Sequence, residues 1–193
     1  MLLRGFGDAA LRPDHETLAV ASWTRRAGVA AIRIDDGPPW GFGGTVAVVE
    51  NLEVFLHLER LGLACDLAVY AAGRLSGRAL AWLASPALEE SRFVHCGDCD
   101  PVGLDEYLRL LAACPGRVTL HLPEGLEECL ATFGKAELLR ASPEVLTRLR
   151  RHADPAVRRV VGWMDRHGAG LEQEALLTIT AARPGGPRAL GGR

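Results

Sequence analysis

Four short apolar runs along the chain predict strands, and a predicted helix follows each of them. The run Thr45–Glu50 is too uniformly apolar for a half-exposed strand, which is typical of a central strand buried on both faces of a parallel sheet. Short joints between strands and helices favour right-handed crossovers. The pattern therefore predicts an α/β fold, a doubly wound parallel sheet flanked by helices. The four predicted strands are Thr45–Glu50, Asp66–Ala71, Arg92–Cys96 and Arg117–Leu122.

The remaining segments have weaker or different patterns. A further strand is predicted at Gly28–Ile34, closed by a turn at Asp36–Pro39. Ser142-Pro143 and Asp154-Pro155 each combine a capping residue with proline at the first helical position, so two helices are expected after the core, packed on the sheet. The predicted segments are an N-terminal linker and strand segment (1–44), the α/β core (45–140), C-terminal helices packed on the core (141–180) and a flexible tail (181–193).

Composition narrows the class of protein. The 193 residues are 48% hydrophobic, which is enough for a sizeable core and excludes a disordered chain. No apolar stretch is long enough for a membrane span, and the first residues lack a signal-peptide pattern. Five cysteines form no disulfide-like framework, so we expect a cytoplasmic protein. The net charge of −2 gives no global attraction to nucleic acid.

Three acidic residues lie where predicted strands end. Glu50 closes the first core strand, and Asp98 and Asp100 follow the third. The carboxyl ends of parallel strands form the edge of the sheet at which ligands bind. Carboxylates brought together there repel one another unless a cation lies between them, and oxygen ligands suit magnesium acting on a phosphate. The alternative is that Asp98 and Asp100 only cap the next helix.

At this point the sequence resembles a known family. The matching motifs are similar to those of the Toprim domain, especially the form in the A subunit of topoisomerase VI, and closer still to the JetD nuclease subunits of Wadjet plasmid-defence systems. The motifs that carry the resemblance are Val49-Glu50-Asn51-Leu52, Gly97-Asp98-Cys99-Asp100, Leu171-Glu172-Gln173-Glu174 and, more weakly, Gly5-Phe6-Gly7-Asp8.

The resemblance implies Mg²⁺- or Mn²⁺-dependent cleavage of DNA. Asp98 and Asp100 would hold the metal, and Glu50 would complete its shell or act as general acid or base. The implied partners are DNA and SMC-like subunits of a defence complex, and a homodimer is left open. The winged-helix regions that precede such domains are missing, so the chain is expected to be a fragment or a reduced relative. Tyr70 and Tyr107 are predicted within the core, which favours water over tyrosine as the nucleophile.

Further residues are candidates for contacts with the substrate or the metal. Arg74 follows the second core strand and could neutralise a phosphate, with a surface arginine as the alternative. Glu172 and Glu174 are candidate additional carboxylates, with a solvated helix face as the alternative. A run of basic residues could follow a DNA backbone, although such charge is usually only solvated. This run comprises Arg148, Arg150, Arg151, His152, Arg158 and Arg159.

Other functions remain open from the sequence. One is a non-catalytic module that binds a partner or a phosphate ligand. Another is an aspartyl-type phosphatase, since an Asp-x-Asp motif after a strand serves that chemistry too, but it does not require Glu50. Cys96 and Cys99 form a C-x-x-C pair, with His95 and His121 as the only further zinc ligands nearby, and buried core cysteines are the favoured interpretation.

Overall fold

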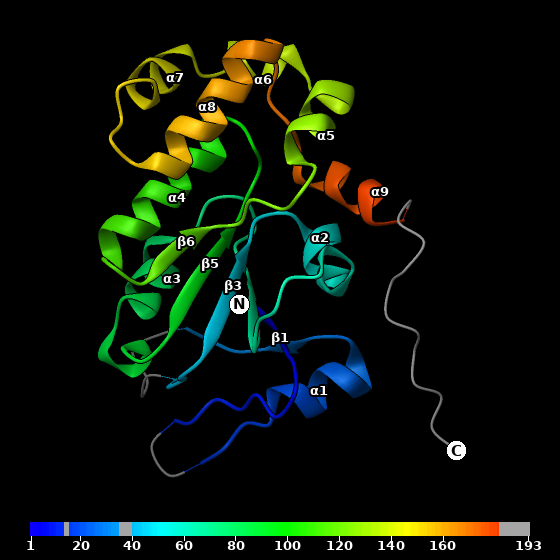
Figure 1. The fold of residues 1–193 in the computed structure, drawn as a ribbon. Coiled ribbons are helices and arrows are strands. Elements are labelled where there is room, and N and C mark those ends of the chain that lie inside the picture. Colours follow the sequence, from blue (N-terminus) through cyan, green and yellow to red (C-terminus); the bar gives the residue numbers. More distant parts are fainter. Residues whose placement is uncertain (14–15, 35–39, 182–193) are drawn as a thin grey trace.

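The computed structural model describes residues 1–13, 16–34 and 40–181, and its centre is a six-stranded sheet (Figure 1). The strand order is β2-β1-β4-β3-β5-β6. Strands β4, β3, β5 and β6 are parallel, whereas β1 pairs antiparallel with β4 and β2 antiparallel with β1. The strands are β1 (Leu2–Gly5), β2 (Ala30–Ala31), β3 (Thr45–Val49), β4 (Leu67–Tyr70), β5 (Arg92–Cys96) and β6 (Val118–Leu120).

Strand β3 is the centre of the parallel core, as its apolar sequence predicted. It pairs with β4 on one side and β5 on the other, and Val46 to Val49 are at most 1% exposed. The chain runs from β3 outward to β4 and then returns to β5 on the other side of β3. A topological switch point therefore lies between β3 and β5, and in open α/β sheets this is where ligands bind.

Helices cover both faces of the sheet, so the predicted α/β class is confirmed and is compatible with a Toprim-like fold. In Figure 1, α3 and α4 lie on one face, and α1 and α2 on the other. The helices are α1 (Val20–Ala27), α2 (Leu52–Leu56), α3 (Gly77–Leu83), α4 (Pro101–Ala113), α5 (Leu126–Phe133), α6 (Ala136–Arg140), α7 (Pro143–Leu149), α8 (Pro155–His167) and α9 (Leu176–Ala181), with 3-10 turns η1 (Leu58–Leu61), η2 (Pro86–Leu88) and η3 (Gln173–Ala175). No helix among these described residues has both the length and the hydrophobicity for a membrane crossing.

The N-terminal segment contributes more to the sheet than the sequence predicted. Hydrophobic periodicity gave no indication of β1 or α1, yet β1 extends the sheet beyond β4 and α1 packs on it. A Cβ atom at Gly5 would lie 2.6 Å from the backbone nitrogen of Ala21, so this packing requires glycine. The strand predicted over Gly28–Ile34 is reduced to the two residues of β2. The turn predicted at residues 36–39, like tail residues 182–193, lies outside the described residues.

The C-terminal helices α7 and α8 pack mainly on helices of the predicted core rather than directly on the sheet. Their main contacts are α7 with α4, α8 with α5, and α7 with α8. The buried stripe of α8 includes Val157, Val160 and Met164. Asp154 caps α8 as predicted, because its Oδ1 accepts hydrogen bonds from the backbone N–H groups of Ala156 and Val157. Ser142, in contrast, makes no side-chain hydrogen bond that caps α7.

Close backbone packing at the start of α4 generates a testable prediction. A Cβ atom at Gly103 would lie 2.2 Å from the carbonyl oxygen of Asp98, so Gly103→Ala is expected to cost about 1–3 kcal/mol of stability through overpacking. Gly162, in the interior of α8, has no atom within 4 Å of such a Cβ, so Gly162→Ala is expected to add about 0.5–1 kcal/mol through helix propensity. Urea denaturation of both variants would measure the difference, and equal effects would contradict this account of the packing.

Candidate functional site

The three predicted carboxylates lie at the switch point of the sheet. Glu50 directly follows β3, Asp98 follows β5 after one glycine, and Asp100 is the N-cap of α4. The backbone N–H of Glu50 donates to the carbonyl of Cys96 at 3.0 Å, which continues the β3–β5 pairing up to the acid. Because neighbouring strands are about 4.8 Å apart, this pairing sets the ends of β3 and β5 side by side.

Glu50 contacts the backbone of the loop that carries Asp98. Its Oε2 accepts a hydrogen bond from the Asp98 N–H at 3.2 Å. Gly97 makes this approach possible, because a Cβ atom there would lie 2.9 Å from Glu50 Oε2 and 2.5 Å from Cε1 of the buried His95. Glu50 and the aspartate loop are therefore held together by a direct contact between β3 and β5.

Backbone N–H groups also fix the two aspartates. Asp98 Oδ1 accepts from the N–H of Gln173 at 2.7 Å, and Asp100 Oδ1 accepts from the N–H of Gly103 at 2.7 Å. Asp100 thus caps α4, as the alternative interpretation of this loop proposed, while Asp98 does not. The second carboxylate oxygens of Glu50 and Asp98 accept no hydrogen bond from described residues, and none of the three acids forms an ion pair with them.

Burial and mutual repulsion raise the pKa values of the three carboxylates. Burial, followed by the charge of Asp98, raises the pKa of Glu50 to about 7. Burial also raises the pKa of Asp98 to about 6, although the Gln173 hydrogen bond opposes the shift. The pKa of Asp100 is raised by burial as well. The negative charge at this edge therefore lacks a positive partner within the described protein, and it favours a bound proton or cation.

The segment from Leu171 to the start of η3 completes the site, and sequence reasoning did not single out its buried residue, Gln173. Leu171 pairs with Cys99 in an antiparallel bridge, with N–H to carbonyl distances of 2.8 and 2.9 Å. This pairing brings Gln173 to Asp98, and Gln173 Oε1 accepts from the N–H of Asn51 at 3.2 Å. Gln173 is 1% exposed, and its Nε2 has no hydrogen-bond partner in the described structure. Gln173 therefore links the loops after β3 and β5.

Glu172 and Glu174, the additional carboxylates predicted from sequence, lie close enough to raise the pKa of Asp98 by their charge. Each already has a partner: Glu172 forms an ion pair with Lys135, and Glu174 Oε1 accepts from Asn51 Nδ2 at 2.7 Å. Leu171 and Gln173 are buried, whereas Glu172 and Glu174 on either side of Gln173 are not.

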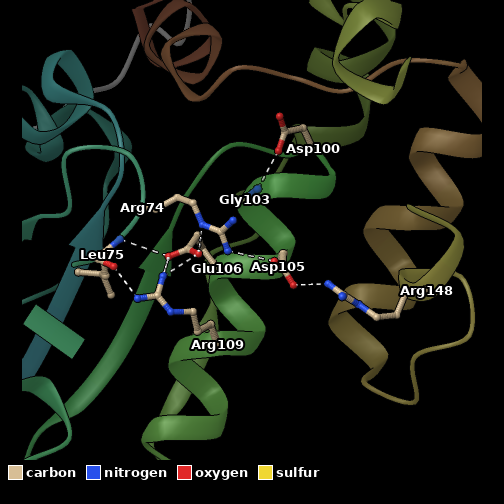
Figure 2. Close-up of polar contacts among 8 residues, drawn as sticks. All are labelled: Arg74, Leu75, Asp100, Gly103, Asp105, Glu106, Arg109 and Arg148. Carbon is tan, nitrogen blue, oxygen red and sulfur yellow. Dashed lines mark hydrogen bonds and ion pairs between the residues drawn. The ribbon is translucent and has the colours of Figure 1, made fainter. Parts of the chain in front are cut away.

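Arg74 reaches the first turns of α4, as Figure 2 shows. Its Nε donates to Glu106 Oε1 at 2.6 Å and its Nη2 to Asp105 Oδ2 at 3.1 Å. Glu106 is 3% exposed and also binds Arg109, while Arg148 pairs with Asp105. Arg74 therefore neutralises acids of α4 in this structure, and a role at a phosphate stays a prediction.

The basic residues of α7 and α8 are only partly engaged. Arg148 is paired with Asp105, and Arg150 with Asp165. The exposed Arg151, Arg158 and Arg159 form no ion pair within the described part of the chain. Their contact with DNA stays a prediction.

The residues behind the alternative chemistries are buried in the core. Tyr107 is 3% exposed and its hydroxyl donates to Asp154 Oδ2 at 3.2 Å. Cys96 and Cys99 are buried free thiols, and burial raises the pKa of Cys99 to about 12, which disfavours a reactive thiolate. This packing supports neither Tyr107 as a nucleophile nor Cys96 and Cys99 as a redox pair.

The three predicted carboxylates share one edge of the sheet without forming a three-ligand metal group of their own in the described residues. Across residues 1–13, 16–34 and 40–181, no three His, Cys, Asp or Glu side chains are grouped to hold a metal. The donors still suit magnesium, which commonly takes only one or two protein carboxylates and completes its shell with water and substrate phosphate. Glu50 and Asp98 each keep an oxygen without a protein partner for this purpose. The assignment of Glu50, Asp98 and Asp100 as ligands stays a prediction.

Together these features define a doubly wound α/β domain with an acidic site at its switch point. Residues 43–183 match the family model described as Wadjet protein JetD, C-terminal, and the chain therefore belongs to this family. The resemblance to JetD seen in the motifs is confirmed. The comparison with curated proteins found no match.

The raised pKa of Glu50 predicts how the stability of the fold changes with pH. Because its pKa is about 7 in the folded chain and 4.5 without the fold, the folded state binds more protons between these values, and stability falls as pH rises through this window. Without divalent metal, Glu50→Gln is expected to remove this loss and to stabilise the fold by about 1–3 kcal/mol above pH 7, solvent screening favouring the lower figure.

The measurement is urea denaturation in chelator from pH 4.5 to pH 8. Glu144→Gln, at an exposed position on α7, is the matched control and should retain the wild-type pH dependence. A Glu50→Gln protein that loses as much stability as wild type across this range would show that Glu50 is not the responsible group.

Proposed function

We propose that this chain is a Toprim-type nuclease domain of a Wadjet-like plasmid-defence system, and that it cleaves DNA phosphodiesters with Mg²⁺ or Mn²⁺. The observation that carries the proposal is the contact of Glu50 with the backbone of Asp98 at the switch point, in a group of acids without a positive partner. Membership of the JetD family supports the defence context.

The three acids have different roles in this proposal. Asp98 and Asp100 would hold the metal, which would polarise the phosphate and lower the pKa of a bound water. Glu50 would accept or donate a proton, because its pKa of about 7 suits transfer near neutral pH. Gln173 would keep Asp98 and the loop after β3 in register through its two hydrogen bonds.

The proposed partners are inferred from the net charge of the chain and from its family. A chain of net charge −2 has little to hold duplex DNA, since affinity rests largely on phosphate contacts made by basic residues. We therefore propose that SMC-like subunits of the same defence complex, or a second copy of the chain, help to retain the DNA.

A non-catalytic binding module is the second candidate. It is favoured by the lack of a three-ligand metal group within the described residues. An aspartyl-type phosphatase is less well supported, because that chemistry gives no reason for Glu50 to be held against the Asp98 loop.

Divalent metal is expected to stabilise the fold, because a cation that binds only the native acidic group favours the folded state. With magnesium or manganese at ten to a hundred times the dissociation constant, the melting temperature should rise by roughly 3–10 °C relative to chelator. The rise should disappear in Asp98→Ala and remain in Glu144→Gln. A rise of equal size in Asp98→Ala would place the metal elsewhere.

Cleavage is expected to be slow for this chain alone and to need divalent metal, low salt and Glu50. Loss of a general acid or base typically costs at least about a hundredfold in rate, so Glu50→Gln should reduce nicking of supercoiled plasmid by that factor. Partner subunits should raise the wild-type rate by retaining the DNA, while Glu144→Gln should behave as wild type.

Equal nicking by wild type and Glu50→Gln would assign the activity to a contaminant or to another site. Absence of nicking under every metal, salt and partner condition would favour the non-catalytic module.

A further inference from the structure

A second candidate site lies beside β4, at the same edge of the sheet as Glu50. It is a pocket of about 620 Å³ between the loop after β4 and the residues that follow β2. Tyr70, Ala71 and Ala72 form one wall, and Ile32 and Ile34 lie on the opposite side. No sequence motif marks this pocket, because its two walls are about 40 residues apart in the chain.

The charged side chains among the described residues that line the pocket are all arginines. Arg33, Arg74 and Arg78 line it, and no Asp or Glu among the described residues does. Arg78 is exposed and forms no ion pair with the described residues. The hydroxyl groups of Tyr70 and Ser76 are the other polar side chains of the lining. The pocket thus offers hydrogen-bond donors and positive charge, which suits an anion.

Arg74 connects the pocket to a network with an excess of positive charge. In Figure 2, the three arginines Arg74, Arg109 and Arg148 form ion pairs with two acids of α4, Asp105 and Glu106. Burial fixes Glu106, which also accepts from the N–H of Leu75 at 3.2 Å. The network therefore holds the arginine in place without cancelling the positive charge of this region.

The pocket is coupled to the acidic site through backbone hydrogen bonds. The N–H of Ala71 donates to the carbonyl of Val49 at 2.8 Å, and the N–H of Gly73 donates to the carbonyl of Glu50 at 3.2 Å. Since paired strands are about 4.8 Å apart and DNA phosphates follow one another at about 3.4 Å of helix rise per strand, a phosphate bound here would lie within one or two nucleotides of a phosphate at Glu50.

We propose that the pocket formed by Tyr70, Arg74, Ser76 and Arg78 binds a phosphate of the DNA backbone next to the one at the acidic site. The identity of the ligand as DNA rests on the proposed function. The arginines of the pocket would bind the DNA strand without metal, whereas the carboxylates of the acidic site would contact the DNA only through a cation.

The test measures DNA binding without cleavage. A fluorescent 20-base-pair duplex is titrated with the full chain in chelator, over a series of low salt concentrations, and binding is followed by anisotropy. Arg78→Ala is expected to weaken binding several-fold and to reduce the slope of log affinity against log salt by about 1, the value for one lost phosphate contact. Arg78→Lys should retain most of the slope.

Arg26→Ala is the matched control, because Arg26 is an exposed arginine on α1 with no ion pair among the described residues, and α1 lies away from the carboxyl edge in Figure 1. It should bind as wild type does. Unchanged affinity and slope in Arg78→Ala would overturn the proposal, as would a wild-type chain that binds no duplex at any salt concentration.

A measurement with inorganic phosphate distinguishes binding of the DNA backbone from binding of a free anion. If the phosphate raised the melting temperature in an Arg78-dependent way while duplex binding was insensitive to Arg78, the pocket would be a small-anion site and the proposal would fail. A cleavage assay separates this proposal from the proposed nuclease function. DNA binding that depends on Arg78, without nicking, would reject the nuclease function but not the phosphate pocket. Nicking by Arg78→Ala at the wild-type rate and affinity would reject the phosphate pocket but not the nuclease function.

Discussion

The main physical constraint on this structure is the electrostatic repulsion among the carboxylates that share one edge of the sheet. Glu50, Asp98 and Asp100 meet where β3 and β5 end, and no lysine or arginine of the described chain is paired with them. Backbone N–H groups hold one oxygen of each acid, which fixes position without cancelling charge. Burial then raises the pKa of Glu50 and Asp98 toward neutrality. An edge with these properties is stable only when a proton or a cation offsets the repulsion.

The same crowding explains the glycines around the acids. A Cβ atom at Gly97 would meet Glu50, one at Gly103 would meet the carbonyl of Asp98, and one at Gly170 would lie 3.0 Å from the Cβ of Asp100. Each glycine therefore allows a segment to approach a carboxylate or its backbone closely. The Gly97-Asp98-Cys99-Asp100 motif, which resembles a family signature, is therefore in physical terms also a packing requirement.

The sequence predicted those parts of the fold that hydrophobic pattern determines. The strands β3 to β6 and the position of Glu50 and Asp98 at their ends follow from apolar runs, because parallel strands buried on both faces have little polar content. Strand β1 could not be found in this way, since it carries Arg4, which is buried and paired with Glu59 on η1. Gln173 was missed because only its acidic neighbours Glu172 and Glu174 were considered as site residues, whereas the bridge between Leu171 and Cys99 brings Gln173 to Asp98.

The edge of the sheet is electrostatically divided. The ends of β3 and β5 carry acids, whereas the loop after β4 and the residues after β2 carry arginines. A DNA strand lying across this edge would need a cation next to the acids but none next to the arginines. Divalent metal and arginine would therefore contact different phosphates of the strand. The overall charge of −2 is therefore a poor guide to nucleic-acid binding, because acids and arginines lie at different parts of the same edge. The antiparallel β1–β2 extension then has a physical role, since it supplies the wall that closes the arginine pocket against β4.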